Sequence, residues 1–197
     1  SPQSISAIIL RKLKDVADGE IGNLVVIESP TINAFVSPTS TDVFVYYGLV
    51  HAFMRYCDNN GIVPTEDMFA YLIGHEMTHV LQKLHPSNIP QSIKDDERKY
   101  KQYRQNLEYD ADRRSLLLMR DAGYNPKDAI HVLNFLLSMG DKPYTEVHPR
   151  STFRTLQILE ILNDPNNVMY VDTMQKNLDE EEKEKLLTPE HNALGIG

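Results

Sequence analysis

His75-Glu76-Met77-Thr78-His79 is the stretch that decides how this chain folds. Apolar residues continue around it at helical spacing, from Phe69 to Leu84, so the pattern predicts a buried helix that carries both histidines. Residues four apart project from nearly the same side of a helix, since they are separated by about one turn plus 40°. Two imidazoles in this arrangement can share one zinc ion, and Glu76 can take a proton from a water on the open side of the metal.

The segments around this helix predict an α+β fold that is mainly helical. Pro64-Thr65-Glu66-Asp67 is typical of a helix start, with Thr65 as the N-cap. Three short apolar runs predict a small sheet, in which the last two strands form a hairpin; these are residues 24–27, 33–36 and 43–46. Further helices are predicted over residues 5–16, 48–58, 94–119, 127–139 and 150–163, and Gly123 is expected to cap the end of the long one.

Length and composition indicate a single globular domain over residues 1–197, with 41% hydrophobic and 24% charged residues. The net charge of -8 disfavours binding to nucleic acid. The one cysteine, Cys57, excludes an intrachain disulfide and a cysteine-rich metal site. We find no apolar run long enough for a transmembrane segment.

A catalytic zinc needs three protein ligands, and His85 is one candidate for the third. Its spacing from His79 matches the metzincin signature H-E-x-x-H-x-x-G-x-x-H. Gln82 stands where that signature has the glycine that turns the chain back towards the metal. If the helix simply continues, His85 points roughly 120° away from His79. The sequence therefore disfavours a metzincin-type site.

Glu108, in Glu108-Tyr109-Asp110-Ala111-Asp112, is the second candidate. Glu108 and Asp112 are four residues apart and share one face of the predicted long helix. Glu108 can bind zinc, while Asp112 can accept a hydrogen bond from the free ring nitrogen of a ligand histidine. The small Ala111 lets this helix approach the first one closely. This pairing favours Glu108 as the third ligand.

These pieces resemble the zinc metallopeptidase family of the CAAX prenyl proteases and the heat-shock protease HtpX, and the chain looks like a soluble member. The resemblance covers about residues 24–162, with a C-terminal helical extension over about 163–197. Four matching pieces follow the family's order: the sheet and hairpin, the H-E-x-x-H helix, Glu108-x-x-Ala111-Asp112, and His148-Pro149 followed by Arg154.

The resemblance implies a zincin-like fold with an active-site helix and a glutamate helix, and a gluzincin-like site. One Zn²⁺ per chain would be held by His75, His79 and Glu108, with Glu76 as the general base. It also implies that His148 lies near the open side of the zinc, where a histidine could stabilise an oxyanion or occupy the fourth position. Arg154 would anchor its loop or pair with Asp112.

We therefore expect a zinc metalloendopeptidase that hydrolyses proteins or peptides, with a role in protein quality control. Val43, Phe44 and Val45 are expected to bind an extended substrate, provided that this strand lies at the edge of the sheet. A cell-envelope or periplasmic location is favoured over the cytoplasm. Two alternatives stay open: a latent or non-catalytic metal-stabilised binding or chaperone-like module, and a metzincin-type protease that uses His85.

Overall fold

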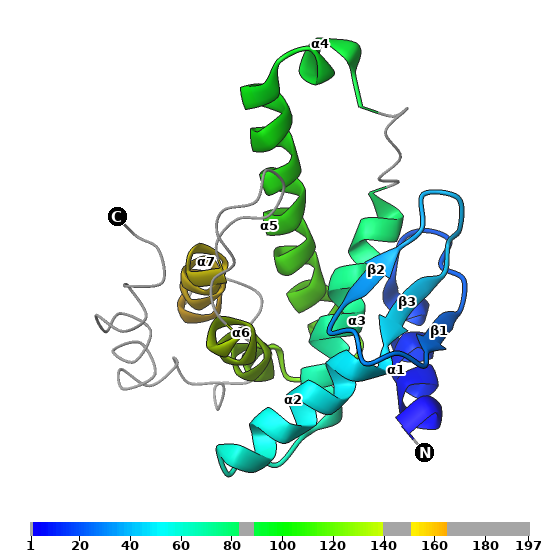
Figure 1. The fold of residues 1–197 in the computed structure, drawn as a ribbon, viewed down its shortest axis with the longest axis vertical. Coiled ribbons are helices and arrows are strands. Elements are labelled where there is room, and N and C mark those ends of the chain that lie inside the picture. Colours follow the sequence, from blue (N-terminus) through cyan, green and yellow to red (C-terminus); the bar gives the residue numbers. More distant parts are fainter. Residues whose placement is uncertain (1, 83–88, 140–150, 165–197) are drawn as a thin grey trace.

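The structure is a computed structural model that describes residues 2–82, 89–139 and 151–164. It is mainly helical with one small sheet, which confirms the α+β prediction (Figure 1). Its elements, in chain order, are α1 (Pro2–Val16), β1 (Leu24–Ile27), β2 (Ala34–Val36), β3 (Val43–Tyr46), α2 (Tyr47–Asn59), α3 (Glu66–Leu81), α4 (Gln91–Lys94), α5 (Glu97–Asp121), the 3₁₀ helix η2 (Pro126–Asp128), α6 (Ala129–Ser138) and α7 (Ser151–Asn163). His85, His148 and the predicted extension beyond residue 164 lie outside the described residues.

The sheet has the order β1-β3-β2, with β1 parallel and β2 antiparallel to β3. The predicted hairpin of β2 and β3 is confirmed. The prediction that Val43, Phe44 and Val45 offer a free edge to a substrate is wrong, because β3 is the central strand and its backbone pairs on both sides. Its side chains also pack within the protein. Val43 and Val45 are buried in the core, and Phe44 stacks on Phe35 with ring centroids 4.9 Å apart.

Helix α3 is the central element of the fold. It packs against α1, α5, α6 and the strands β2 and β3 (Figure 1). Nine of its residues are buried, whereas one face, with Phe69, Leu72, Glu76 and Val80, is half-buried; the buried residues are Met68, Ala70, Tyr71, Ile73, Gly74, His75, Met77, Thr78 and His79. A helix that is buried over most of its circumference cannot shift against its neighbours without opening the core, so the two histidines are held in a rigid setting.

Helices α3 and α5 approach closely at Gly74 and Ser115. A Cβ on Gly74 would lie only 2.6 Å from Oγ of Ser115, so this position has room for glycine alone. Ser115 Oγ donates a hydrogen bond of 2.7 Å to the carbonyl oxygen of Tyr71, and Ala111 one turn earlier is fully buried. Small residues at this contact bring Glu108 within reach of the histidines on α3.

The predicted helix boundaries shift where polar side chains cap the backbone. The long helix was predicted from Lys94, but α5 begins at Glu97 because the Asp96 side chain accepts a hydrogen bond from the Lys99 backbone. The short helix α4 precedes it. At the other end, Gly123 has a positive φ of 84°, as expected for a residue that closes a helix.

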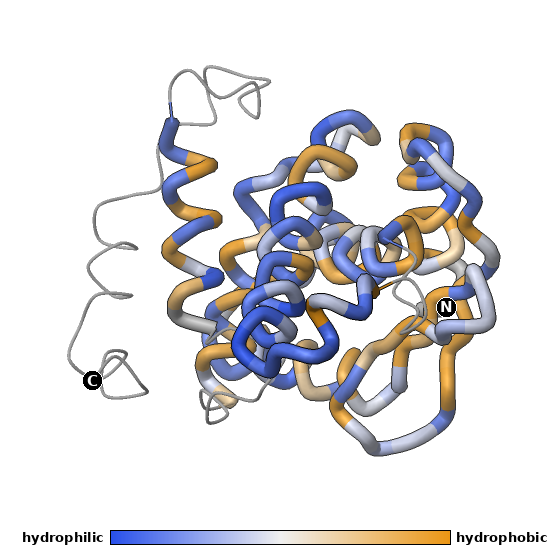
Figure 2. The backbone as a smooth tube through the Cα atoms, turned by 90° about the horizontal axis from the view of Figure 1, so that it is seen from above, coloured by the Kyte–Doolittle hydropathy of each residue, from blue (hydrophilic) through white to orange (hydrophobic). Residues whose placement is uncertain are grey.

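Helix α7 alternates hydrophobic and hydrophilic residues along its length, as the helix beside the grey C-terminal trace in Figure 2 shows. Its apolar side is buried against α6 and α5 through Ile158, Leu159 and Leu162. Within the described ranges, every helix is too short or too polar to cross a membrane. The packing of α7 against α5 brings Arg154 to the polar centre described next.

Candidate metal centre

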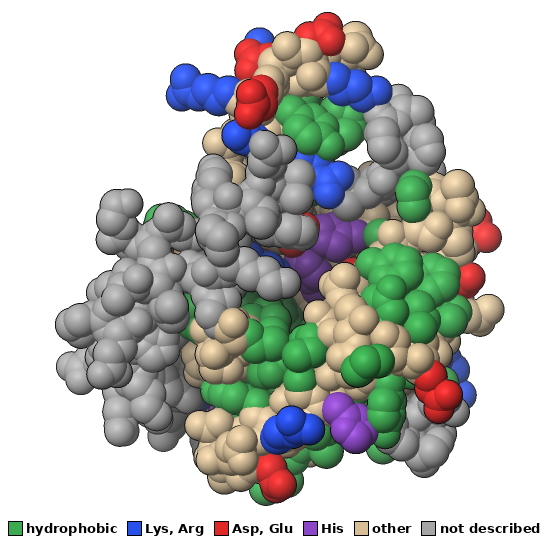
Figure 3. All heavy atoms as spheres, in the orientation of Figure 1, with side chains coloured by type: hydrophobic (Ala, Val, Ile, Leu, Met, Phe, Trp, Pro, Cys, Tyr) green, Lys and Arg blue, Asp and Glu red, His purple; other side chains and the backbone are tan. Residues whose placement is uncertain are grey.

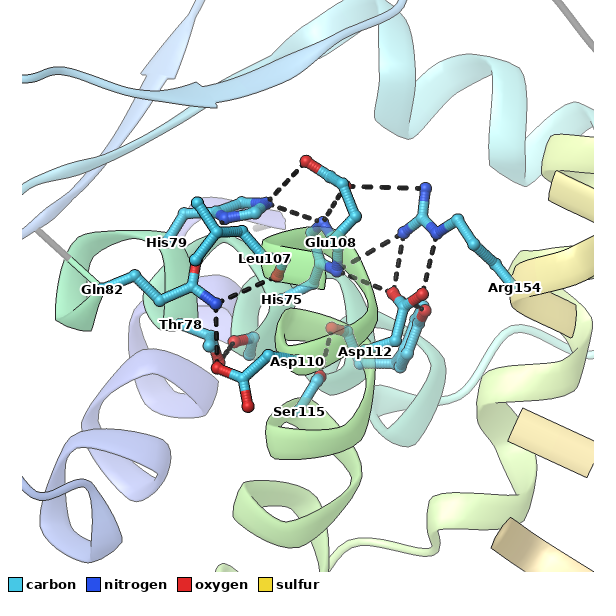
Figure 4. A network of polar contacts seen from close by, with 12 residues as sticks. His75, Thr78, His79, Gln82, Leu107, Glu108, Asp110, Asp112, Ser115 and Arg154 are labelled. Atoms are coloured by element: carbon cyan, nitrogen blue, oxygen red, sulfur yellow. Dashed lines mark hydrogen bonds and ion pairs between the residues drawn. The ribbon is translucent and has the colours of Figure 1, made fainter. Parts of the chain in front are cut away.

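Three buried side chains converge where α3 meets α5 (Figure 4). His75 and His79 come from successive turns of α3, and Glu108 comes from the facing side of α5. The Nε2 atoms of the two histidines are 3.1 Å apart. Glu108 Oε2 lies 3.4 Å from Nε2 of His75, and Oε1 lies 3.3 Å from Nε2 of His79.

These separations fit a metal ion with tetrahedral coordination. Ligand atoms at the usual zinc distance of about 2.0–2.1 Å are about 3.3 Å from one another in a tetrahedral site. Two imidazole nitrogens and a carboxylate oxygen are also donors that zinc commonly takes. Within the described residues, no other group of histidine, cysteine and acidic side chains comes together in this way.

Asp112 connects His75 to two further elements. Its Oδ1 is 2.9 Å from Nδ1 of His75 and accepts a hydrogen bond of 2.8 Å from the Tyr71 hydroxyl. Arg154 on α7 donates two hydrogen bonds to the same carboxylate, from Nε at 2.8 Å and from Nη2 at 2.7 Å. Such a two-point contact fixes the carboxylate in place. The arrangement orients the His75 ring so that Nε2 faces His79 and Glu108.

The charges in this cluster determine its protonation. Burial alone would raise the pKa of Asp112, but the charge and hydrogen bonds of Arg154, together with His75, hold that pKa well below its usual range. Burial opposes protonation of His75, yet its contacts with Asp112 and Glu108 raise its pKa to about 10. The two neighbouring carboxylates therefore favour the doubly protonated, cationic form of His75.

His79 has a different partner. Its Nδ1 lies 2.9 Å from Oε1 of Gln82, the residue that follows α3 by one position. The Gln82 amide nitrogen donates to the Leu107 carbonyl oxygen at 3.0 Å and to Oδ2 of Asp110 at 2.9 Å. Gln82 thus joins the end of α3 to the segment of α5 that carries Glu108.

Glu76 is half-buried next to His75 on α3. Within the described part of the chain it forms no hydrogen bond or ion pair. Figure 3 shows histidine side chains at the bottom of a hollow on the face below α4.

The structure brings together His75, His79, Glu108, Asp112 and Arg154, which were singled out from the sequence. It does not include Val43, Phe44 and Val45, which lie in the sheet. The sequence did not reveal the contacts that three other residues make at the site: Tyr71, Gln82 and Asp110. The signal for Tyr71 and Gln82 was available, because they lie four residues before His75 and three after His79, on the same helical faces.

Comparison with protein families agrees with this geometry. Residues 4–91 match peptidase family M48, and the matched segment contains the sheet and the whole of α3. A comparison with curated proteins finds no match. The glutamate on α5 lies beyond the matched segment and completes the cluster in space. The match over residues 4–91 supports membership of the chain in peptidase family M48.

Proposed function

We propose that this chain is a zinc-dependent metalloendopeptidase with a zincin-like fold. The observation that carries the proposal is the convergence of His75, His79 and Glu108, whose ligand atoms all lie within 4.8 Å of one another in the core. The similarity of residues 4–91 to peptidase family M48, a family of zinc-dependent peptidases, supports it. A role in protein quality control follows from the resemblance alone and stays a prediction.

His75, His79 and Glu108 would hold the zinc ion. Zinc bound there would act as a Lewis acid that polarises the scissile carbonyl and makes water acidic enough to attack at neutral pH. Asp112 and Gln82 would keep the two imidazoles turned towards the metal, because each contacts the ring nitrogen on the far side. Arg154 would neutralise Asp112 and keep the buried cluster from accumulating negative charge.

Glu76 is the proposed general base. It follows the first proposed ligand directly on α3, so its carboxylate would lie beside the position where substrate and water meet. It would take a proton from the attacking water and deliver it to the nitrogen of the leaving amine. His148, which lies outside the described residues, stays a proposed partner for the developing oxyanion.

The substrate would add to the sheet at β2 rather than at β3. Among the described strands β2 has a single neighbour, β3, and it also packs against α3. An extended peptide paired with the other edge of β2 would run beside the helix that carries the histidines. Recognition through backbone hydrogen bonds places few demands on side chains, so we expect broad cleavage of unfolded segments.

The test is a Glu76→Gln variant assayed on an unfolded protein such as casein. The wild type should bind about one zinc per chain and cleave the substrate. The variant should keep the zinc, because Glu76 is not a ligand, and lose at least about 100-fold in rate. A Glu97→Gln variant, at the exposed start of α5, is the matched control and should retain activity. Cleavage at the wild-type rate by the Glu76 variant would contradict the mechanism.

A further inference from the structure

The side-chain amide of Gln82 lies between His79 on one side and Leu107 and Asp110 of α5 on the other (Figure 4). The backbone keeps helical geometry through this residue, with φ of -69°, and its N–H donates to the Thr78 carbonyl oxygen. A side chain three residues after His79 therefore falls on the same face as the ring. A glycine here would leave Nδ1 of His79 without this partner.

The orientation of the Gln82 amide follows from its contacts with α5. A backbone carbonyl oxygen can only accept a hydrogen bond, and Leu107 O lies 3.0 Å from one end of the amide. Oδ2 of Asp110 lies 2.9 Å from the same end. That end must be the NH₂ group, so the other end, towards His79, is the carbonyl oxygen.

This orientation selects one tautomer of His79. The Gln82 oxygen can only accept, so the hydrogen in the 2.9 Å contact belongs to Nδ1 of His79. In a neutral imidazole with Nδ1 protonated, Nε2 carries the free lone pair. That atom lies 3.3 Å from Glu108 Oε1 and 3.1 Å from Nε2 of His75.

We propose that Gln82 is a positioning residue that fixes His79 as the Nδ1-protonated tautomer and so prepares Nε2 as a metal ligand. The inference rests on the proposed zinc site. The two histidines are then oriented by different groups. The carboxylate of Asp112 orients His75, whereas the neutral amide of Gln82 orients His79 without adding a charge. Through Leu107, Gln82 also holds the backbone next to Glu108, the ligand from the other helix.

The experiment compares Gln82→Met, which keeps the side-chain length but removes the amide, with Gln102→Met. Gln102 is an exposed glutamine on α5 whose amide contacts only the neighbouring turn, at Asn106. Zinc affinity is measured by competition with a chromophoric chelator. Gln82→Met should weaken it by about 10–100-fold, the usual cost of losing a residue that orients a ligand. Gln102→Met should leave it unchanged.

The second readout is the ¹⁵N spectrum of the imidazoles in metal-free protein, which reports the tautomer of each ring. The wild type should show His79 protonated at Nδ1. Gln82→Met should lose this preference, while His75 keeps its proton towards Asp112. Unchanged zinc affinity together with an unchanged His79 tautomer would overturn the proposal. A wild type that binds no zinc would count against the proposed function, and the metal-free spectrum would still test Gln82.

A double variant, Gln82→Glu with Asp110→Asn, guards against a merely structural explanation. The carboxylate keeps an acceptor for His79 Nδ1–H, and the new amide at position 110 can donate to its other oxygen, while the Leu107 carbonyl oxygen loses the donor that Gln82 supplied. This variant should retain the Nδ1-protonated tautomer that Gln82→Met loses. Loss of that tautomer in the double variant would contradict the assigned role, because the acceptor is still present.

Discussion

Oδ1 of Asp112 lies 2.9 Å from Nδ1 of His75, and the same carboxylate is gripped by Arg154 from a third helix. A ligand histidine is thereby tied to the packing of α3, α5 and α7. Buried ionic groups of this kind contribute little net stability as a complete set, but removing one member leaves the others unpaired. The orientation of His75 and the stability of the core should therefore respond to the same substitutions.

Asp112→Asn should destabilise the metal-free protein by about 3–5 kcal/mol, because the Arg154 guanidinium loses its counter-charge in the core. Chemical denaturation measures this change. The matched control is Asp121→Asn at the exposed end of α5, where Asp121 pairs with Arg120. That surface pair should contribute no more than about 1 kcal/mol. Equal losses in the two variants would contradict the assignment of Asp112 as the centre of the cluster.

The buried pair can also be replaced as a unit. Asp112→Leu combined with Arg154→Met removes both charges and keeps apolar volume, so it should recover most of the stability lost in Asp112→Asn. Zinc affinity should stay reduced by about 10–100-fold, since His75 still lacks its partner. Recovery of both stability and zinc affinity would show that Asp112 has no role in orienting His75.

The pH dependence follows from the raised pKa of His75. Its folded value of about 10 exceeds the ordinary value of 6.5. The stabilisation from its protonated ring is thus fully present below about pH 6.5, and in the metal-free protein it declines as the pH rises through about 10. Zinc binding needs the neutral ring, so at pH 7.5 it should release about one proton. Calorimetry in buffers of different ionisation enthalpy measures this release, and its absence would contradict the raised pKa.

Gly74→Ala should push α3 away from α5, because the new Cβ would lie 2.6 Å from Ser115 Oγ. The overpacking should cost about 1–3 kcal/mol, partly offset by about 1 kcal/mol from the better helix propensity of alanine. Zinc affinity should fall as well, since Glu108 moves with α5. Adding Ser115→Ala removes the close oxygen and should restore part of both losses. Wild-type zinc affinity in Gly74→Ala alone would contradict the claim that this close contact between α3 and α5 positions Glu108.

The sequence predicted α3 and its histidines well because one signal was repeated at several levels: apolar spacing, a polar start and the i, i+4 pair all indicate one buried helix. Glu108 and Asp112 were also predictable, since their spacing matches the needs of a ligand and its partner. The position of β3 was not, because strand order depends on long-range pairing that a short apolar run does not encode. Gln82 was noticed only as a missing glycine, and its contact with α5 depends on tertiary packing.

The central claim is that Glu108, together with His75 and His79, forms the metal site. The most direct measurement is the zinc dissociation constant of Glu108→Ala set beside that of His85→Ala. We predict that Glu108→Ala weakens zinc binding by more than about 100-fold. This loss exceeds the cost of removing a residue that only orients a ligand. The zinc dissociation constant of His85→Ala should match that of the wild type. Intact zinc affinity in Glu108→Ala, with a loss in His85→Ala, would contradict the account and identify a metzincin-type site instead.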